Sequence, residues 1–355
     1  MPTEPITMTE TNRQVQLAAR PNGFPKNSDF QIAGAPVPEA GDGEMLVRNI
    51  YMSVDPYMRG RMNDFSGSYI PPFPIGGPMG GGAVGQVIQS KHGDFSEGDI
   101  VLNQNGWQEY FIRPGDKLND GADPIKIDPS LAPLSAFLGV LGMPGLTAYA
   151  GLTEIGVPKS GETFYVSAAA GAVGAIAGQM AKIKGCRVVG SAGSDEKVAY
   201  LTDEIGFDAA FNYKTQDLNK ALADACPNGI DVNFENVGGD MLQAVLHQMN
   251  SGGRIIYCGS ISGYNATTPL PGPNNLMMMI MREVAMRGYI VTSHMHLMPA
   301  FYQDIGGWLK SGQMTYRETV VDGIENAPSA FMGMLKGENM GKMIVKVGPD
   351  PTQQT

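Results

Sequence analysis

The sequence predicts a two-domain α/β protein, in which a doubly wound parallel sheet is inserted into a β-rich domain built from both ends of the chain. The first observation is length, because 355 residues exceed what one hydrophobic core usually supports. The second is a change of pattern, since short β patterns between Pro and Gly turns give way after Pro129 to alternating strand and helix patterns. The third is the return of β character near the C-terminal end.

The first part of the chain reads as an irregular antiparallel β domain. Residues 1–27 are polar and begin as a loose arm, with a candidate edge strand at 13–17. Further β patterns, each bounded by glycine or charged turns, follow at 44–50, 83–90, 99–102 and 107–112. Residues 131–152 carry no charge, but their two prolines and four glycines favour a series of loop, helix and turn over a membrane span.

The middle of the chain alternates strands with helical segments. The strand candidates are 164–167, 187–190, 209–212, 232–235, 254–258 and 288–292. Six strands in this alternation predict a complete doubly wound sheet. Strands at 317–321 and 343–347, with a helix at 327–335 between them, rejoin the first domain. We therefore expect one domain to comprise 1–141 and 317–355, and the other to comprise 142–316.

The segment 164–190 predicts a strand, a tight turn of small residues, a helix and a second strand. Such a turn brings free backbone N–H groups and the positive end of the helix dipole together, which suits the pyrophosphate of a dinucleotide. The fingerprint G-x-G-x-x-G is incomplete, because Ala169 stands at its first position and only Gly171 and Gly174 match. Small-residue turns also occur in βαβ units that bind nothing, so the motif alone leaves the question open.

Composition excludes several classes of function. A net charge of −10 and a pI near 4.9 argue against nucleic acid or an anionic membrane as the main partner. Cys186, Cys226 and Cys258 are an odd number at wide spacing, which forms neither a disulfide framework nor a metal knuckle. Reduced thiols and an N-terminal segment without an apolar core predict a cytoplasmic location.

The residues after the second strand of the sheet favour NADP(H) over NAD. An acid usually ends that strand in NAD-binding domains, but here the small, neutral residues 191–194 follow it. Lys197 could pair with a 2′-phosphate, and Ser194 with the open amides of the next helix could donate to it. In the rival interpretation Asp195 is the ribose acid and Lys197 a solvated helix residue, although Asp195 and Glu196 resemble first-turn helix charges.

The chain resembles a known family in the blocks AAAGAVG, SAGSDEKVAYL, GFDAAFNYKT, NFENVGGDML, RIIYCGSISGYN, KGENMGKMIVKV, SVDPYMRGRM and MPGLTAY. It is similar to the zinc-independent medium-chain dehydrogenases/reductases, and within them to the leukotriene B4 dehydrogenase/prostaglandin reductase branch with its bacterial curcumin reductase-like enzymes. The resemblance spans nearly the whole chain. It implies a GroES-like catalytic domain around a Rossmann domain, a homodimer, and NADPH-dependent reduction of the carbon–carbon double bond of an α,β-unsaturated ketone or aldehyde.

The resemblance also implies which residues contact NADP(H). The pyrophosphate residues would be Gly171, Ala172, Val173 and Gly174, and the residues at the adenosine phosphate would be Ser194, Lys197 and Tyr213. The nicotinamide side would be formed by Asn236, Cys258, Gly259, Ser260, Ile261, Tyr264, Tyr289, Ile290 and Val291, with Asn339 reaching back from the last segment. Plainer roles stay open, because Tyr213 could be a surface aromatic, Cys258 a small strand-end residue, and Asn236 the cap of a turn.

No metal is expected. The sequence has glycines, Pro78 and Met79 over 76–82, where metal-binding relatives carry Gly-His-Glu, and the close pair His294 and His296 lacks further ligands. Reduction of an enone then needs hydroxyl donors at the carbonyl oxygen, where negative charge arrives. By resemblance these are Tyr264 and Tyr69, with Tyr57 as a weaker third, although Tyr69 lies in a Pro-rich loop that could simply pack it. The α-carbon proton comes from a tyrosine or from solvent.

Two other functions stay open beside enone reduction. The first is quinone reduction on the same scaffold, and the second is NADP(H) binding without catalysis. The Met-rich run 276–286 reads as an apolar helix of the core or of a subunit interface, and alternatively as a pliable pocket wall. Together with an edge strand at 289–292 it could supply the interface of the homodimer.

Overall fold

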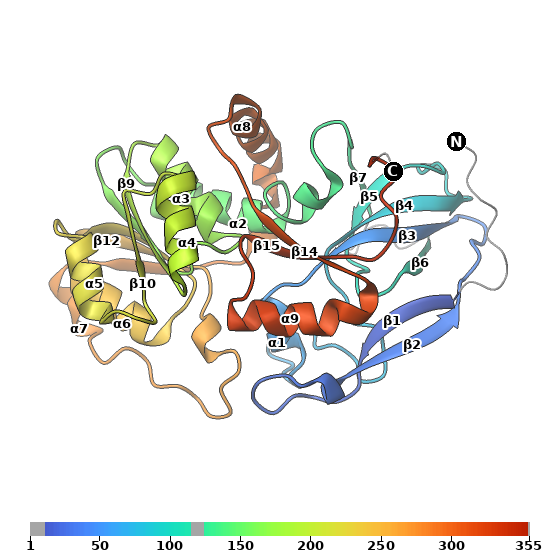
Figure 1. Ribbon diagram of the computed structural model, residues 1–355, viewed down its shortest axis with the longest axis horizontal. Helices are drawn as coiled ribbons and strands as arrows, with labels where there is room; N and C mark the ends of the chain where they lie inside the picture. Colours follow the sequence, from blue (N-terminus) through green and yellow to red (C-terminus); the bar gives the residue numbers. More distant parts are fainter. Residues whose placement is uncertain (1–10, 115–123, 354–355) are drawn as a thin grey trace. The chain divides into compact units, whose positions relative to one another are not determined.

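The computed structural model describes residues 11–114 and 124–353. Contacts between Cα atoms divide the chain into two compact units. The first comprises Met1–Leu138, Thr319–Glu338 and Met343–Thr355, and the second comprises Gly139–Glu318 and Asn339–Lys342. The colours of Figure 1 show that the first unit combines blue N-terminal with red C-terminal segments. The expected domain boundaries at 141/142 and 316/317 stay a prediction.

The first unit is a β domain of antiparallel strands. Its main sheet has the order β14-β15-β3-β4-β5-β7, and β6 also pairs with β3. The strands are β3 (Glu44–Ser53), β4 (Ala83–Ser90), β5 (Ile100–Asn103), β6 (Tyr110–Pro114), β7 (Ile125–Lys126), β14 (Glu318–Asp322) and β15 (Lys342–Lys346). A separate antiparallel pair is formed by β1 (Thr11–Leu17) and β2 (Phe30–Pro36). The helices are α1 (Tyr57–Arg61) and α9 (Ala327–Lys336). The strand β15 pairs antiparallel with β3, so this C-terminal strand lies in the main sheet of the first unit.

Three aromatic rings from distant parts of the sequence form the centre of this unit. Trp107 is fully buried, and its ring stacks on Phe30 at 6.4 Å between centroids and meets Phe331 of α9 edge-on at 6.0 Å. Burial of such large rings contributes most of the hydrophobic stabilisation of a core. The helix α9 is therefore an integral part of the N-terminal β domain and not an appended tail.

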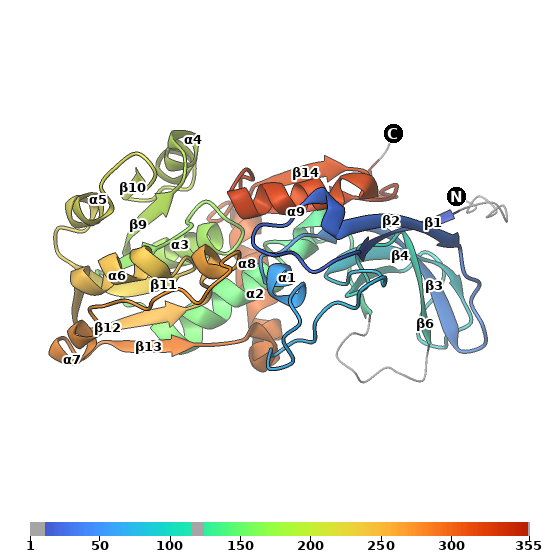
Figure 2. The same cartoon turned by 90° about the horizontal axis from the view of Figure 1, so that it is seen from below.

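The second unit contains the predicted Rossmann sheet, with six parallel strands in the order β10-β9-β8-β11-β12-β13. The strands are β8 (Thr163–Val166), β9 (Arg187–Ala192), β10 (Ala209–Asn212), β11 (Ile230–Glu235), β12 (Met249–Tyr257) and β13 (Ala285–Gly288). The helices are α2 (Met143–Ala150), α3 (Gly174–Ile183), α4 (Asp195–Ala199), α5 (Leu218–Ala225), α6 (Gly239–Gln248), α7 (Met277–Met281) and α8 (Met298–Ser311). Figure 2 shows α6 and α2 on opposite sides of the strands.

The last strand lies earlier than predicted. The β pattern at 288–292 suggested a strand there, but β13 ends at Gly288. The physical reason is its neighbour, because Gly288 pairs with Tyr257, the last residue of β12. Beyond this point no backbone of β12 remains to extend the ladder, so Tyr289 and Ile290 leave the sheet.

Close contact between helix and sheet explains the glycines around the turn. A Cβ on Gly174 would lie 2.5 Å from the backbone oxygen of Ala168, and one on Gly190 would lie 2.7 Å from Cβ of Ala169. Neither position can hold a larger residue without moving backbone. Ala169 itself fits because it is buried against Gly190 and its N–H donates to Ser191 O at 2.9 Å. The alanine at the first fingerprint position is therefore compatible with a tight turn.

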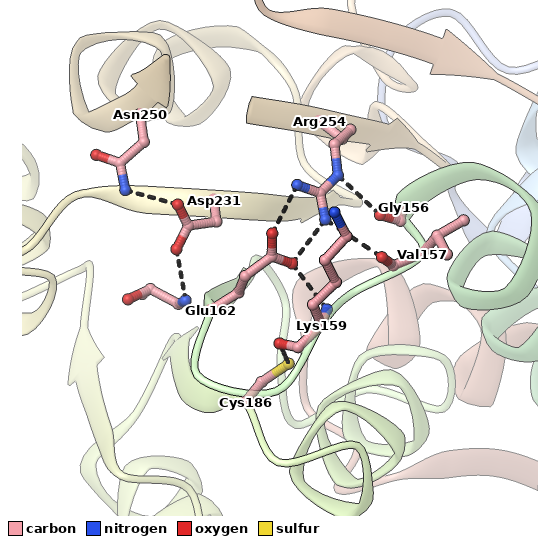
Figure 3. A network of polar contacts seen from close by, with 9 residues as sticks. Gly156, Val157, Lys159, Glu162, Cys186, Asp231, Asn250 and Arg254 are labelled. Carbon is pink, nitrogen blue, oxygen red and sulfur yellow. Dashed lines mark hydrogen bonds and ion pairs between the residues drawn. The ribbon is translucent and has the colours of Figure 1, made fainter. Parts of the chain in front are cut away.

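A network of polar contacts ties strands together within this unit (Figure 3). The Arg254 guanidinium donates to both carboxylate oxygens of Glu162, at 2.9 and 2.6 Å, and through Nε to Gly156 O. Glu162 also accepts from the N–H of Lys159. Asp231 accepts from Thr163 N and from the Asn250 side chain. The network joins β8, β11 and β12 near the beginnings of β8 and β11.

We expect Glu162→Gln to lower the free energy of unfolding by about 1 kcal/mol at neutral pH, after screening of this partly exposed pair. The hydrogen bond from Arg254 holds the pKa of Glu162 below its ordinary value. The ion pair therefore stabilises the fold above the unfolded pKa of about 4.3, and this stabilisation is lost as the pH falls through the folded pKa. Urea unfolding at several pH values tests this, and a difference between variant and wild type that grows toward acidic pH would contradict it.

No helix in the described ranges is long and apolar enough to cross a membrane.

Candidate functional site

The turn between β8 and α3 forms the first part of the site. Gly171, Ala172 and Val173 are half-buried, and Gly171 N donates to Ala168 O at 3.0 Å to close the turn. No side chain caps the first turn of α3, and within this turn Ala175 N donates to Gly171 O at 3.1 Å. Backbone amides at the start of a ten-residue helix suit a pyrophosphate.

Asn339 is placed beside this turn by a short backbone bridge. Gly341 N donates to Ala170 O at 2.9 Å, and Gly171 pairs with Gly341. The side-chain amide of Asn339 donates to Gly341 O at 2.7 Å. The structure therefore brings the segment of Asn339 beside the turn between β8 and α3, and the Asn339 amide fixes the conformation of residues 339–341.

Cationic and hydroxyl groups gather after β9 and β10. Ser194 caps α4, and its Oγ accepts from Lys197 N at 3.3 Å. A Cβ placed on Gly193 would lie 3.2 Å from the Tyr213 hydroxyl and 3.4 Å from Lys214 Nζ. Burial lowers the pKa of Lys197, and the nearby charge of Lys214 lowers it further. Two ammonium groups held close together, with two hydroxyls near them, are an arrangement that an anion would stabilise.

Asp195 has a different partner from the one that the rival interpretation requires. Its Oδ1 accepts from the Asn212 side chain at 2.8 Å, and the residue is exposed in the first turn of α4. This arrangement matches a helix N-terminal charge. Sequence reasoning missed Lys214, although it directly follows Tyr213 in the same block.

The carboxyl ends of β8 and β11 are joined by side-chain hydrogen bonds. Asn236 donates from its backbone N to Ser167 Oγ, and from its side chain to Ser167 O, each at 2.8 Å. Ser167 Oγ in turn donates to Glu235 Oε1 at 2.9 Å. Asn236 thus connects two strands and does not merely cap a turn. The strand order reverses between β8 and β11, which is where open α/β sheets bind ligands.

The loop after β12 folds over the end of β11. Cys258 N and Gly259 N both donate to Glu235 O, and Ile261 N donates to Asn236 O. A Cβ on Gly259 would lie 3.4 Å from the hydroxyl of Tyr264, a half-buried residue. Burial raises the pKa of the Cys258 thiol to about 11, so the thiol stays protonated at neutral pH and does not act as an anion.

Ser260 belongs to this loop, and its side chain lies next to Gly238 at the start of α6. It lines a cavity of about 500 Å³ together with Gly239, Leu242, Tyr257 and residues of the segment 262–273. The lining mixes hydroxyl groups with prolines and Leu270. The cavity is confined to the second unit and offers room for a small molecule next to the carboxyl ends of the strands.

The residues after β13 are fixed by contacts with α2 and its extension. The Tyr289 hydroxyl donates to Thr147 O at 2.7 Å, and the ring of Tyr289 meets that of His294 edge-on. Ile290 and Val291 follow, partly exposed. His294 and His296, which the sequence presents as a close pair without further metal ligands, both form hydrogen bonds with the carboxylate of Glu154, at 2.5 and 2.7 Å. Among the residues that the structure describes, no three His, Cys, Asp or Glu side chains are grouped to hold a metal ion.

Two of the expected tyrosines belong to the β unit. Tyr57 opens α1 and is half-buried, whereas Tyr69 is 63% exposed. Burial raises the pKa of Tyr57 well above its ordinary value, the charge of Asp55 adds to this effect, and Arg61 opposes it. A protonated hydroxyl can donate a hydrogen bond at neutral pH. Tyr264 belongs to the other unit.

The fold and these residues define a class: an oxidoreductase with a GroES-like β domain and a Rossmann domain. Residues 13–120 match the family described as the N-terminal domain of oxidoreductase, and residues 172–305 match the family described as zinc-binding dehydrogenase. The chain belongs to the prostaglandin reductase/curcumin reductase branch of the medium-chain dehydrogenase/reductase superfamily. The resemblance found in the sequence is thereby confirmed.

Individual relatives are similar over nearly their whole length. NADPH-dependent curcumin reductase of Escherichia coli (strain K12) is 45% identical, over 96% of this chain and 98% of that protein. The NADP(+)-dependent 2-alkenal reductase of Nicotiana tabacum is 46% identical, over 95% of this chain and 98% of that protein. The crystal structure of CurA in complex with NADPH from Vibrio vulnificus is 44% identical, has a TM-score of 0.89, and covers 95% of this chain and 100% of that chain.

Proposed function

We propose that this protein reduces the carbon–carbon double bond of α,β-unsaturated ketones and aldehydes with NADPH. The main support for NADPH as the cofactor is a cluster of polar side chains near Gly193, formed by Lys197, Lys214, Ser194 and Tyr213. A 2′-phosphate would form charge-assisted hydrogen bonds with both ammonium groups, and an NAD-type ribose has no group that could do so. Relatives that are named as curcumin reductase and 2-alkenal reductase support the substrate class.

The residues of the second unit fit the parts of such a dinucleotide in order along the sheet. Residues 171–174 at the start of α3 would hold the pyrophosphate, and the lysine cluster would hold the 2′-phosphate. The segments 258–264 and 289–291 would contact the nicotinamide half, with Asn236 and Asn339 beside them. When bound, NADPH supplies a hydride for the β-carbon of the substrate.

The role that we propose for the tyrosines is stabilisation of the carbonyl oxygen. Hydride addition to the β-carbon moves negative charge onto that oxygen, and a hydroxyl donor placed there stabilises it. Tyr264 is the first candidate, followed by Tyr69 and Tyr57. Their hydroxyls donate without a change of charge, and the proposal needs no metal. The proton for the α-carbon would come from a tyrosine or from solvent.

A spectrophotometric screen of NADPH oxidation over enones, alkenals and quinones, with NADH as the control, tests this proposal. We expect turnover of enones and alkenals to saturated carbonyl products, identified by mass spectrometry, and little turnover with NADH. Reduction of quinones alone would favour quinone reductase activity on the same scaffold. Tight binding of NADPH without reduction of any acceptor would favour a binding protein without catalysis.

We also propose that the protein is a cytoplasmic homodimer. Its three cysteines are free thiols, which suits a reducing compartment. All four residues of β13 are exposed at the end of the sheet, and such an edge can pair with a second copy. Next to it, Met277, Ile280 and Met281 are 62–75% exposed. The reading of this Met-rich helix as part of the core is wrong for these side chains, and an interface would bury them.

Ile280→Glu combined with Met281→Glu is expected to convert the dimer to monomer, because two charges would be buried in an apolar interface. Size-exclusion chromatography with light scattering measures the change. Leu131→Glu is the matched control, since Leu131 is equally exposed, at 69%, but belongs to the other unit. A wild-type protein that is monomeric at micromolar concentration would refute the dimer.

A further inference from the structure

Glu235 carries a buried carboxyl group to which the proposed reaction assigns no role. It is the last residue of β11 and is fully shielded from solvent. Its Oε1 accepts from Ser167 Oγ at 2.9 Å and from Val237 N and Gly238 N at 2.8 Å. Its Oε2 accepts from the Asn233 side chain at 3.1 Å. A carboxyl group in the middle of a parallel sheet is costly and calls for a reason.

The hydrogen bonds indicate that this carboxyl group is ionised. All four partners donate to the carboxyl group, and amide N–H groups can only donate, so a proton on Glu235 would have no acceptor among them. The fourth, Ser167 Oγ, already accepts from Asn236 N, which leaves its proton for Glu235. Burial raises the pKa of Glu235, and these hydrogen bonds oppose that shift. In the described ranges no Lys, Arg or His forms an ion pair with it.

The sheet order places this charge on the nicotinamide side of the proposed cofactor site. The lysine cluster follows β9 and β10, so the adenosine half lies on that side of β8. With the pyrophosphate at α3, the other half of a dinucleotide must extend over β11 and β12. Glu235 ends β11, and its backbone oxygen holds Cys258 and Gly259 of the loop after β12.

We propose that Glu235 is an electrostatic positioning residue of the cofactor site, whose fixed negative charge stabilises the oxidised nicotinamide over the reduced one. This inference rests on the proposed placement of NADP(H). The oxidised ring carries a positive charge and the reduced ring is neutral, so a nearby anion distinguishes them. It thereby favours the direction in which bound NADPH gives up hydride. The charge acts through space, while the same carboxylate holds the strand ends on which the cofactor rests.

The inference is tested by the dissociation constants of NADP⁺ and NADPH, measured on the full-length protein by calorimetry and cofactor fluorescence. A unit charge about 10 Å away in an effective dielectric of about 20 changes the ratio of the two constants by about tenfold. Glu235→Gln should therefore weaken NADP⁺ binding about tenfold relative to NADPH binding. Glu235→Asp, which keeps the charge, should retain most of the wild-type ratio.

Two control variants separate the effect of the Glu235 charge from the effect of a disturbed local structure. Asp231→Asn removes a carboxylate from the other end of the same strand, four residues and about 13 Å away, and should leave the ratio unchanged. Ser167→Ala disturbs the strand ends but keeps the charge, so it should weaken both forms of the cofactor alike. A Glu235→Gln ratio within twofold of wild type overturns the inference.

A second variant keeps the inference testable if Glu235→Gln does not fold. Val237→Lys adds a cation two residues from Glu235 and keeps the backbone N–H that donates to Glu235, at a half-buried position that packs against the core of this unit. It should shift the ratio in the same direction as Glu235→Gln, and an unchanged ratio in this variant would also overturn the inference. Failure of the wild type to bind either form would instead overturn the proposed cofactor site, and the inference with it.

Discussion

Lys197→Ala is expected to raise the dissociation constant for NADPH by about 10- to 100-fold. The double variant Lys197→Ala, Lys214→Ala should raise it further. Each ammonium group would form a charge-assisted bond to the 2′-phosphate, worth about 1.5–3 kcal/mol. The two lysines are close enough for the charge of Lys214 to lower the pKa of Lys197. An anion between them relieves this repulsion, so the pair contributes to affinity both by attraction and by removal of like-charge strain.

The discriminating measurement is the affinity for NADH, which lacks the 2′-phosphate and should be unchanged or slightly improved. Lys220→Ala is the matched control, since Lys220 is an exposed lysine of the same unit that already pairs with Asp224. It should change neither affinity. An equal loss of NADPH and NADH affinity in the Lys197 variant would mean that the lysine supports the fold of α4 and not the phosphate.

The order of strands and helices along the chain could be predicted from local sequence patterns, whereas most contacts between side chains could not. Six strands could be predicted because buried parallel strands are short apolar runs between helices. The end of β13 could not, because it depends on where its neighbour β12 stops. The composition of the Met-rich run fits a helix of the core or of a subunit interface, and it does not predict that Met277 and Met281 of the short helix α7 are exposed.

The candidate site shows the same division. The role of Ser194 and Lys197 could be predicted because both residues follow the second strand of the sheet closely, at a fixed spacing from the dinucleotide fingerprint. Lys214 was missed because it approaches Gly193 through the pairing of Ala192 with Asn212 in neighbouring strands. Glu235 differs from other acids at strand ends in its complete burial and its four donors, and neither property can be read from the sequence. Contacts across strands are set by register, and register is a property of the whole sheet.

Tyr264→Phe is expected to lower kcat for an enone by about 100-fold, with little change in the dissociation constant for NADPH. The loss of one donor at a developing oxyanion costs about 2.7–4 kcal/mol where that donor acts alone, and Tyr69 or Tyr57 would replace part of it. The hydroxyl of Tyr264 lies near Gly259 in the loop over β11, so its removal leaves the pyrophosphate turn and the lysine cluster intact. Stopped-flow measurement of hydride transfer in a single turnover isolates this step.

Tyr69→Phe and Tyr57→Phe complete the comparison. The exposed Tyr69 should have the smaller effect, because a donor in water stabilises charge weakly. Tyr57 is partly buried and stays protonated over the whole neutral range, so it can still donate when Tyr264 is absent. The double variant Tyr57→Phe, Tyr264→Phe should therefore lose more than either single variant. Unchanged single-turnover rates in all of these variants would leave the cofactor's own ribose hydroxyl as the donor to the carbonyl oxygen, and would remove the tyrosines from the mechanism.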